Sequence, residues 1–151
     1  MRRIGFMAAV AAVLVGALGA GARAGVVNPY TPEALCGLGF TAVDQDPIHD
    51  AATGQLLGTV HLLRNPFTGY GCTVTLKSAY VGALTRTQVY LDPESISFAV
   101  DDGNRLYAAG PVYGYLNGGC AIWGGLIVDA SGAVHRHDRA NPAIGGAVTC
   151  F

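Results

Sequence analysis

The chain has 151 residues, of which 51% are hydrophobic and only 13% are charged, and its formal net charge at pH 7 is −1. It contains a single lysine, Lys77, and no basic stripe, which argues against a nucleic acid partner. A chain of this length is sufficient for one domain with a modest hydrophobic core.

The first 24 residues have the three parts of a secretory signal peptide. Arg2 and Arg3 precede the apolar run Ile4 to Ala20, and Ala22-Arg23-Ala24 places small residues at the positions that a signal peptidase reads. The apolar run is short for a membrane span, so we expect cleavage after Ala24 and no membrane-spanning segment afterwards. Three of the nine basic residues lie in this leader and all ten acidic residues follow it, which leaves a net charge of −4 on a single domain of residues 25–151.

One short helix is predicted at the start of the exported chain. In the segment NPYTPEALCG, Thr31 suits the N-cap, Pro32 the first helical position and Gly37 the residue after the helix end. Beyond it the apolar residues alternate with a period of two, which is typical of strands. Nine strands are predicted: Phe40–Asp46, Leu56–Arg64, Cys72–Ala79, Thr87–Leu91, Ser95–Val100, Leu106–Tyr113, Cys120–Val128, Ala133–Asp138 and Ala147–Phe151.

Turn-forming residues separate these strands at regular intervals. One example is Asp101-Asp102-Gly103-Asn104, which has the composition of a tight turn. Another is Asn117-Gly118-Gly119, which predicts a hairpin before the strand that begins at Cys120. Short alternating strands with regular turns predict an all-β fold, either a small antiparallel sandwich or a barrel of about seven to nine strands.

The alternation is clearest in the segment Cys72–Ala79. One face of this strand carries Cys72, Val74, Leu76 and Ser78, and the other face carries Thr73, Thr75 and Lys77. The pattern predicts a half-buried strand in which the face with the threonines and the lysine is exposed to solvent.

The segment Cys120–Val128 is apolar on both faces, which predicts a strand in the centre of the packed domain. It contains the only tryptophan, Trp123, and we expect that side chain to be buried. The neighbours expected for Trp123 are Val74, Leu76, Ile96 and Phe98. Gly124 and Gly125 predict a bulge or the close approach of another segment.

All four cysteines lie in the exported part: Cys36, Cys72, Cys120 and Cys150. Because disulfides persist outside the cytoplasm, we expect two bridges and hence three possible pairings. We favour Cys36 with Cys72 and Cys120 with Cys150, since consecutive strands of a meandering sheet are usually neighbours in space. The spacing contains no C-x-x-C pair, which argues against a zinc site.

Several segments of the exported chain form a specific pattern. They are the opening NPYTPEALCG, the second cysteine in a strand-turn-strand, the segment YAAGPVY at 107–113, and Cys120 shortly before Trp-Gly-Gly, with a last cysteine near the end. Together they resemble the spore-associated protein A family of streptomycetes and related actinobacteria. The resemblance implies a small secreted protein found with spores or aerial growth. It implies no catalytic or binding residues, because the biochemical activity of that family is not established.

Two histidines are the candidates for a metal site. His135 and His137 would project to one side of a strand, with Asp129 or Asp138 nearby, which is a geometry that a metal can use. We favour the alternative that both lie on a polar, exposed edge strand, where replacing either by alanine would change stability by about 0.5 kcal/mol or less. We therefore expect no bound metal.

The sequence contains no catalytic motif, so we expect neither enzymatic activity nor a cofactor. The main interpretation is a secreted, non-enzymatic protein whose partner is a spore surface or a cell-wall polymer. One alternative is a glycan-binding or wall-binding module that uses exposed members of the set Tyr107, Tyr113 and Tyr115, because tyrosine rings stack on sugars. A second alternative is a secreted protease inhibitor that presents the loop Asn65 to Gly71 to a protease.

Overall fold

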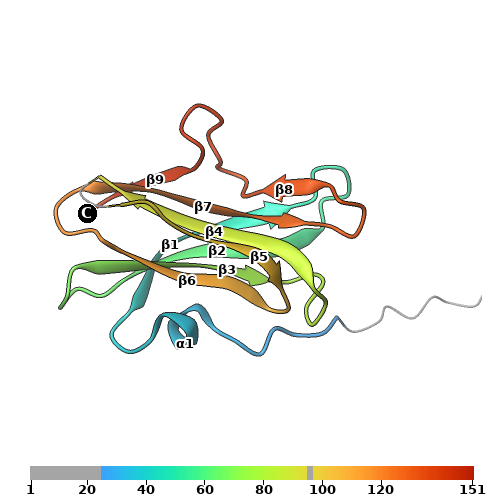
Figure 1. Cartoon of the computed structure of the whole chain (residues 1–151), viewed down its shortest axis with the longest axis horizontal. Coiled ribbons are helices and arrows are strands. Elements are labelled where there is room, and N and C mark those ends of the chain that lie inside the picture. Colours follow the sequence, from blue (N-terminus) through green and yellow to red (C-terminus); the bar gives the residue numbers. More distant parts are fainter. Residues whose placement is uncertain (1–24, 95–96) are drawn as a thin grey trace, which may run out of the picture.

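The computed structural model describes residues 25–94 and 97–151, and in them two antiparallel β-sheets pack face to face (Figure 1). The prediction of an all-β sandwich is therefore confirmed. The leader expected at residues 1–24, and the residues Ser95 and Ile96 at the start of one predicted strand, lie outside the described part of the chain.

The described part of the chain contains one helix and nine strands. They are α1 (Pro32–Cys36), β1 (Thr41–His49), β2 (Leu56–Arg64), β3 (Tyr70–Lys77), β4 (Thr85–Pro93), β5 (Ala99–Arg105), β6 (Ala108–Tyr115), β7 (Cys120–Val128), β8 (Val134–Arg136) and β9 (Ala147–Cys150). The helix begins as predicted, because the Thr31 side chain accepts a hydrogen bond from the Ala34 amide (3.2 Å). It ends at Gly37, whose φ of 97° favours glycine.

The first sheet has the strand order β1-β2-β3-β6, and the second has the order β5-β4-β7-β8, with β9 also paired to β7. Strands β8 and β9 share one edge of β7, since β9 pairs with Cys120–Trp123 and β8 pairs with Leu126–Val128. Neither strand covers Gly124 and Gly125, so the edge of β7 has a gap between its two partners.

The core lies between the sheets, and Trp123 is completely buried in it, as predicted. Two of the four expected neighbours of Trp123 were wrong, and a third, Ile96, lies outside the described residues. Val74 belongs to a separate cluster on the outer face of the first sheet, and Phe98 is 55% exposed. The indole instead stacks on the His137 ring, with 6.2 Å between the ring centroids, and the Arg139 guanidinium lies 5.5 Å from the centroid of the indole.

Gly125 allows the two sheets to approach closely, which confirms one of the two glycine predictions. The Thr75 hydroxyl of β3 donates a hydrogen bond of 2.9 Å to the Gln88 carbonyl of β4, directly across the sandwich. A Cβ atom at Gly125 would lie 2.3 Å from that hydroxyl and 2.5 Å from that carbonyl oxygen. Any side chain at this position would push the sheets apart.

The exposed face predicted for the third strand was wrong. Thr73, Thr75 and Lys77 are buried and face the second sheet. The opposite face is covered as well, because α1 packs over Cys72, Val74 and Leu63 on the outer side of the first sheet (Figure 1). β3, one of the two inner strands of this sheet, is thus buried on both sides.

Lys77, the only lysine, is one of the buried residues. Its ammonium group donates hydrogen bonds to the carbonyl oxygens of Ala83 (2.7 Å) and Arg105 (3.1 Å). Burial lowers the pKa of Lys77 from 10.5 to about 8. The side chain therefore ties the loop after β3 to the end of β5.

The turn predicted at Asp101-Asp102-Gly103-Asn104 was also wrong, since these residues form the middle of β5. Their charges are neutralised by neighbouring side chains. Arg86 of β4 donates two hydrogen bonds to Asp102 (2.9 and 2.7 Å), and Asp101 pairs with Arg105. Because β5 is an edge strand, such polar residues remain compatible with strand structure.

Two disulfides join the elements in the pairing favoured from the sequence. Cys36–Cys72 links α1 to β3, and Cys120–Cys150 links β7 to β9. Among the described residues, no helix is long and apolar enough to cross a membrane.

Candidate functional site

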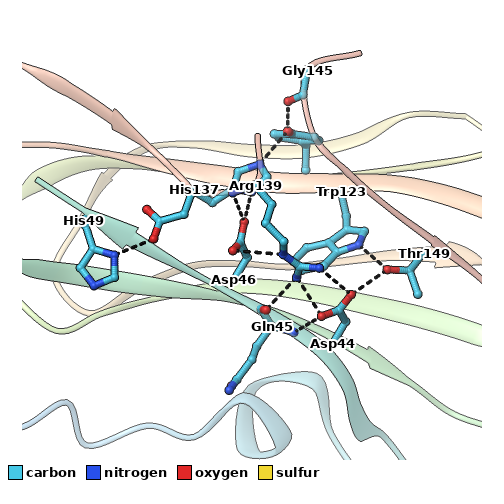
Figure 2. A network of polar contacts seen from close by, with 11 residues as sticks. Asp44, Gln45, Asp46, His49, Trp123, His137, Arg139, Gly145 and Thr149 are labelled. Carbon is cyan, nitrogen blue, oxygen red and sulfur yellow. Dashed lines mark hydrogen bonds and ion pairs between the residues drawn. The ribbon is translucent and has the colours of Figure 1, made fainter. Parts of the chain in front are cut away.

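Polar side chains gather where segment 137–146 crosses the gap in the edge of β7. The amide of His137 donates to the Gly125 carbonyl (3.3 Å), and the amide of Asp138 donates to the Pro47 carbonyl of β1 (2.9 Å). The segment therefore connects the second sheet to the edge strand of the first. We call the residues Asp44, Asp46, His137, Arg139 and Thr149 the edge cluster (Figure 2).

The edge cluster depends on two carboxylates that point inward from β1. Asp44, Asp46 and Ile48 alternate along the strand, and Asp46 and Ile48 are buried. This strand was predicted to end at Asp46, but it continues through Pro47 to His49 because proline is tolerated in an edge strand.

Asp46 accepts hydrogen bonds from two residues of the crossing segment. Nδ1 of His137 lies 2.5 Å from Oδ2, and the backbone amide of Arg139 lies 2.8 Å from the same oxygen. Nε of Arg139 lies 3.2 Å from Oδ1. The side chains of Asp46 and His137 are 2% and 1% exposed, so the hydrogen bond between them is shielded from water.

Asp44 continues the network toward the core. It accepts a hydrogen bond of 2.8 Å from Arg139 and one of 3.0 Å from the Thr149 hydroxyl. Partial burial opposes ionisation of Asp44, but these hydrogen bonds outweigh that effect and lower its pKa. The Thr149 hydroxyl also accepts a hydrogen bond of 2.9 Å from the Trp123 indole, which connects the network to the core (Figure 2).

The second ring nitrogen of His137 faces the interior of the protein. Nε2 lies 3.4 Å from the Tyr90 hydroxyl, and that hydroxyl donates to the Gly145 carbonyl. A Cβ atom at Gly124 would lie 2.2 Å from Nε2 and 2.3 Å from the Tyr90 oxygen, so the prediction that Gly124 marks a close approach is also confirmed. Burial raises the pKa of Tyr90.

A buried Asp–His pair beside a tyrosine contains the residue types of a general base. Here, however, Oδ2 of Asp46 accepts hydrogen bonds from His137 and Arg139, and Oδ1 lies beside the Arg139 guanidinium. Nε2 of His137 is enclosed by Gly124 and Tyr90. A reacting atom has no space beside that nitrogen. The arrangement is therefore suited to fastening the two sheets together.

The expectation that His135 and His137 lie together on an exposed strand was wrong. His137 follows the end of β8 and is buried, because the chain turns inward there to reach Asp46. Nε2 of His135 instead pairs with Asp129 at 2.8 Å. The Ser131 hydroxyl and His135 lower the pKa of Asp129. In the part of the chain that the structure describes, no group of three or more histidine, cysteine, aspartate or glutamate side chains could hold a metal ion.

The three tyrosines proposed for ligand binding occupy two separate places. Tyr113 and Tyr115 lie near the end of β6 and are partly exposed, whereas Tyr107 precedes β6 and packs on Tyr30, with 5.5 Å between the ring centroids. The structure therefore brings Tyr115 close to Tyr70 (5.6 Å) rather than to Tyr107.

The loop proposed for protease inhibition forms a compact turn. The Asn65 side chain accepts hydrogen bonds from the amides of Phe67 (3.0 Å) and Thr68 (3.3 Å), and the Asn65 carbonyl accepts one from Gly69 (2.9 Å). A chain that enters a protease cleft as an added strand is extended, so this turn gives no specific support to inhibition.

Sequence reasoning missed most of the edge cluster, namely Asp44, Asp46, Arg139 and Thr149. The sequence did contain one signal for the cluster. Asp44 and Asp46 alternate with Ile48, so the two carboxylates share a strand face with an apolar side chain.

Comparison with known proteins gives one informative match. The chain is 37% identical over 134 residues to Spore-associated protein A of Streptomyces coelicolor, and the match covers 80% of this chain and 81% of the relative. No family profile matches the chain, and no solved structure matches it.

Proposed function

Because the chain belongs to the spore-associated protein A family, we propose that it is a secreted, non-enzymatic protein that associates with a spore or cell surface. The observation that carries this proposal is the similarity to the streptomycete protein, which extends over most of both chains. The relative's name supplies the association with spores and says nothing of a reaction.

Two features of the chain support secretion. The first is the leader pattern in the sequence, with Arg2 and Arg3, an apolar run and Ala22-Arg23-Ala24. The second is the use of all four cysteines in disulfides, which are typical of proteins outside the cytoplasm.

The edge cluster supports a non-enzymatic role. A general base must reach the proton that it removes, and Nε2 of His137 is enclosed by protein atoms. We propose that the cluster acts on stability alone, and that the surface of the sandwich carries the function.

Fractionation of the producing organism tests the proposal. An antibody against the chain is used on medium, washed envelope, spores and cytosol, and the recovered protein is examined by intact mass and thiol titration. We expect protein that starts at Gly25, has no free thiol and is found with the envelope or spores. Unprocessed protein with four reactive thiols in the cytosol would contradict secretion.

The non-enzymatic assignment is tested on the purified, oxidised protein. Hydrolysis of peptidoglycan and chitin is measured beside inhibition of secreted proteases, with His137→Gln as the matched variant. We expect no turnover and no stoichiometric inhibition from either protein. Turnover that disappears in the variant while the fold is retained would assign a catalytic role to His137.

A further inference from the structure

Two large apolar side chains project almost completely into solvent at one end of the sandwich. Leu38, in the loop between α1 and β1, is 99% exposed, and Phe67, in the turn between β2 and β3, is 93% exposed. Isolated apolar residues are common on protein surfaces, but these two occupy adjoining loops.

The two loops adjoin because they leave neighbouring strands at paired positions. Thr41, at the start of β1, is opposite Arg64, at the end of β2. A Cβ atom at Gly39 would lie 2.7 Å from the Asn65 side-chain nitrogen, so the loops are in close proximity. Leu38 precedes Gly39 by one residue, and Phe67 follows Asn65 by two residues along the chain.

Both loops are held rigidly by the fold. The turn 65–69 is fixed by the hydrogen bonds of Asn65, and its first amide also donates to the Tyr70 carbonyl (2.8 Å). The loop 37–40 starts beside the Cys36–Cys72 disulfide. The backbone from which the two side chains project is therefore anchored, so little ordering of the loops is needed when the side chains are buried.

Tyrosine rings lie behind the two apolar tips. Tyr70 and Tyr115 pack edge to face, and the Tyr113 ring packs on Phe40 while its hydroxyl donates to the Cys36 carbonyl (2.9 Å). All three tyrosines are partly exposed. Rings with an apolar body and a polar end are enriched at the boundary between hydrocarbon and water.

The charge of this end is close to neutral. Segments 37–40 and 65–70 contain no ionisable acid or base other than Tyr70. The adjacent Arg64 is engaged by the Phe151 ring, at 5.2 Å from its guanidinium carbon, and by Asn117 (3.4 Å). The end therefore lacks the basic patch that attracts anionic lipids.

We propose that this end of the sandwich, with Leu38 and Phe67 at its tips, docks on an uncharged lipid surface. Protein partners require a complementary surface of about 800 Å² on each side, whereas hydrocarbon accepts two separate protruding side chains without a matching pocket. This inference rests on the proposed surface association and identifies the chemistry of the surface.

Vesicle flotation tests the inference. The protein is produced by export, so that its disulfides form, and is mixed with phosphatidylcholine vesicles at low and high salt. We expect flotation that does not depend on salt or on anionic lipid. Leu38→Ser with Phe67→Ser should reduce vesicle affinity roughly tenfold or more, since two exposed side chains no longer enter hydrocarbon. Both residues are exposed, so the double variant should fold.

The matched control is Leu84→Ser, because Leu84 is also exposed (67%) but lies at the opposite end of β3, in the loop before β4. This variant should float like the parent. A second readout uses Phe67→Trp, whose fluorescence should shift to the blue on vesicles while the buried Trp123 stays unchanged, with Leu84→Trp as the control.

Three results would overturn the inference: no flotation, equal flotation of the double variant, or binding that requires anionic lipid. Retention on peptidoglycan without flotation, lost on Tyr70→Ala, would assign the end to glycan binding instead. Envelope association in the producing organism without vesicle binding leaves the proposed function standing and removes this inference. Vesicle binding without envelope or spore association removes the proposed function.

Discussion

Replacing His137 by alanine should destabilise the protein far more than replacing any other histidine. The change removes a hydrogen bond to the buried Asp46 carboxylate, which is worth about 1.5–3 kcal/mol. It also removes a ring packed on Trp123 and against Gly124, and we assign about 1–2 kcal/mol to that loss. The free energy of unfolding should therefore fall by about 2.5–5 kcal/mol.

Arg139 limits the loss of stability caused by His137→Ala. Its amide still donates to Asp46 after His137 is removed, and its guanidinium remains 3.2 Å from Oδ1, so the carboxylate keeps a hydrogen bond and a nearby positive charge. For a domain with a free energy of unfolding of about 5–15 kcal/mol, the variant should still fold at low temperature.

The measurement is urea unfolding followed by circular dichroism with both disulfides intact. The control is His49→Ala, because the His49–Asp138 pair is 38% and 44% exposed and should contribute about 1 kcal/mol or less. If His137→Ala and His49→Ala unfold at the same urea concentration, the edge cluster does not fasten the sheets and the reasoning fails.

Stability should rise as the pH increases from about 8 to 10. Lys77 has a pKa of about 8 in the folded protein, compared with 10.5 for an exposed lysine, so the unfolded state binds the extra proton in this range. Urea unfolding at several pH values measures the slope, and Lys77→Met should abolish it. Gly125→Ala should cost about 2 kcal/mol or more through overpacking against Thr75, and a melting temperature equal to that of the parent would refute the close approach. Removing the Cys36–Cys72 bridge with a double serine variant should cost about 3–4 kcal/mol for a loop of 36 residues, as measured by thermal unfolding.

The strands were predictable because their apolar period is local. β2 and β7 start and end where the alternation places them, and α1 starts directly after its capping residue Thr31. β5 was misplaced because its aspartates have the composition of a turn. Only the fold shows that Arg86 of the neighbouring strand pairs with Asp102.

Alternation separates the two faces of a strand but does not show what covers each face. In β3, Thr73 and Thr75 are polar enough for a solvent-exposed face, yet they are buried between the sheets, where Thr75 bonds to Gln88. The Cys72 face is covered by a helix of only five residues. Whether a sheet or a helix covers a given face of the strand depends on contacts between segments that are distant in the sequence.

The edge cluster depends on such distant contacts. Asp46 and His137 are 91 residues apart, and nothing near either residue identifies the other. The tripeptide at 135–137 reads as one polar unit, but the structure directs His135 to Asp129 and His137 to the interior. The local spacing predicted that the two histidines share a site. In the structure the chain turns between them and separates their side chains.

The wide separation of the edge cluster along the chain has a consequence for the timing of folding. At about 5–20 residues per second, Asp46 is synthesised roughly 5–20 s before His137, and Thr149 comes 105 residues after Asp44. Until then, the inward carboxylates of β1 lack the partners that the folded protein gives them, and the sheets are not fastened. A growing chain that cannot close stays open for longer, and for the secretion that we propose an open chain is the form able to pass through a narrow channel.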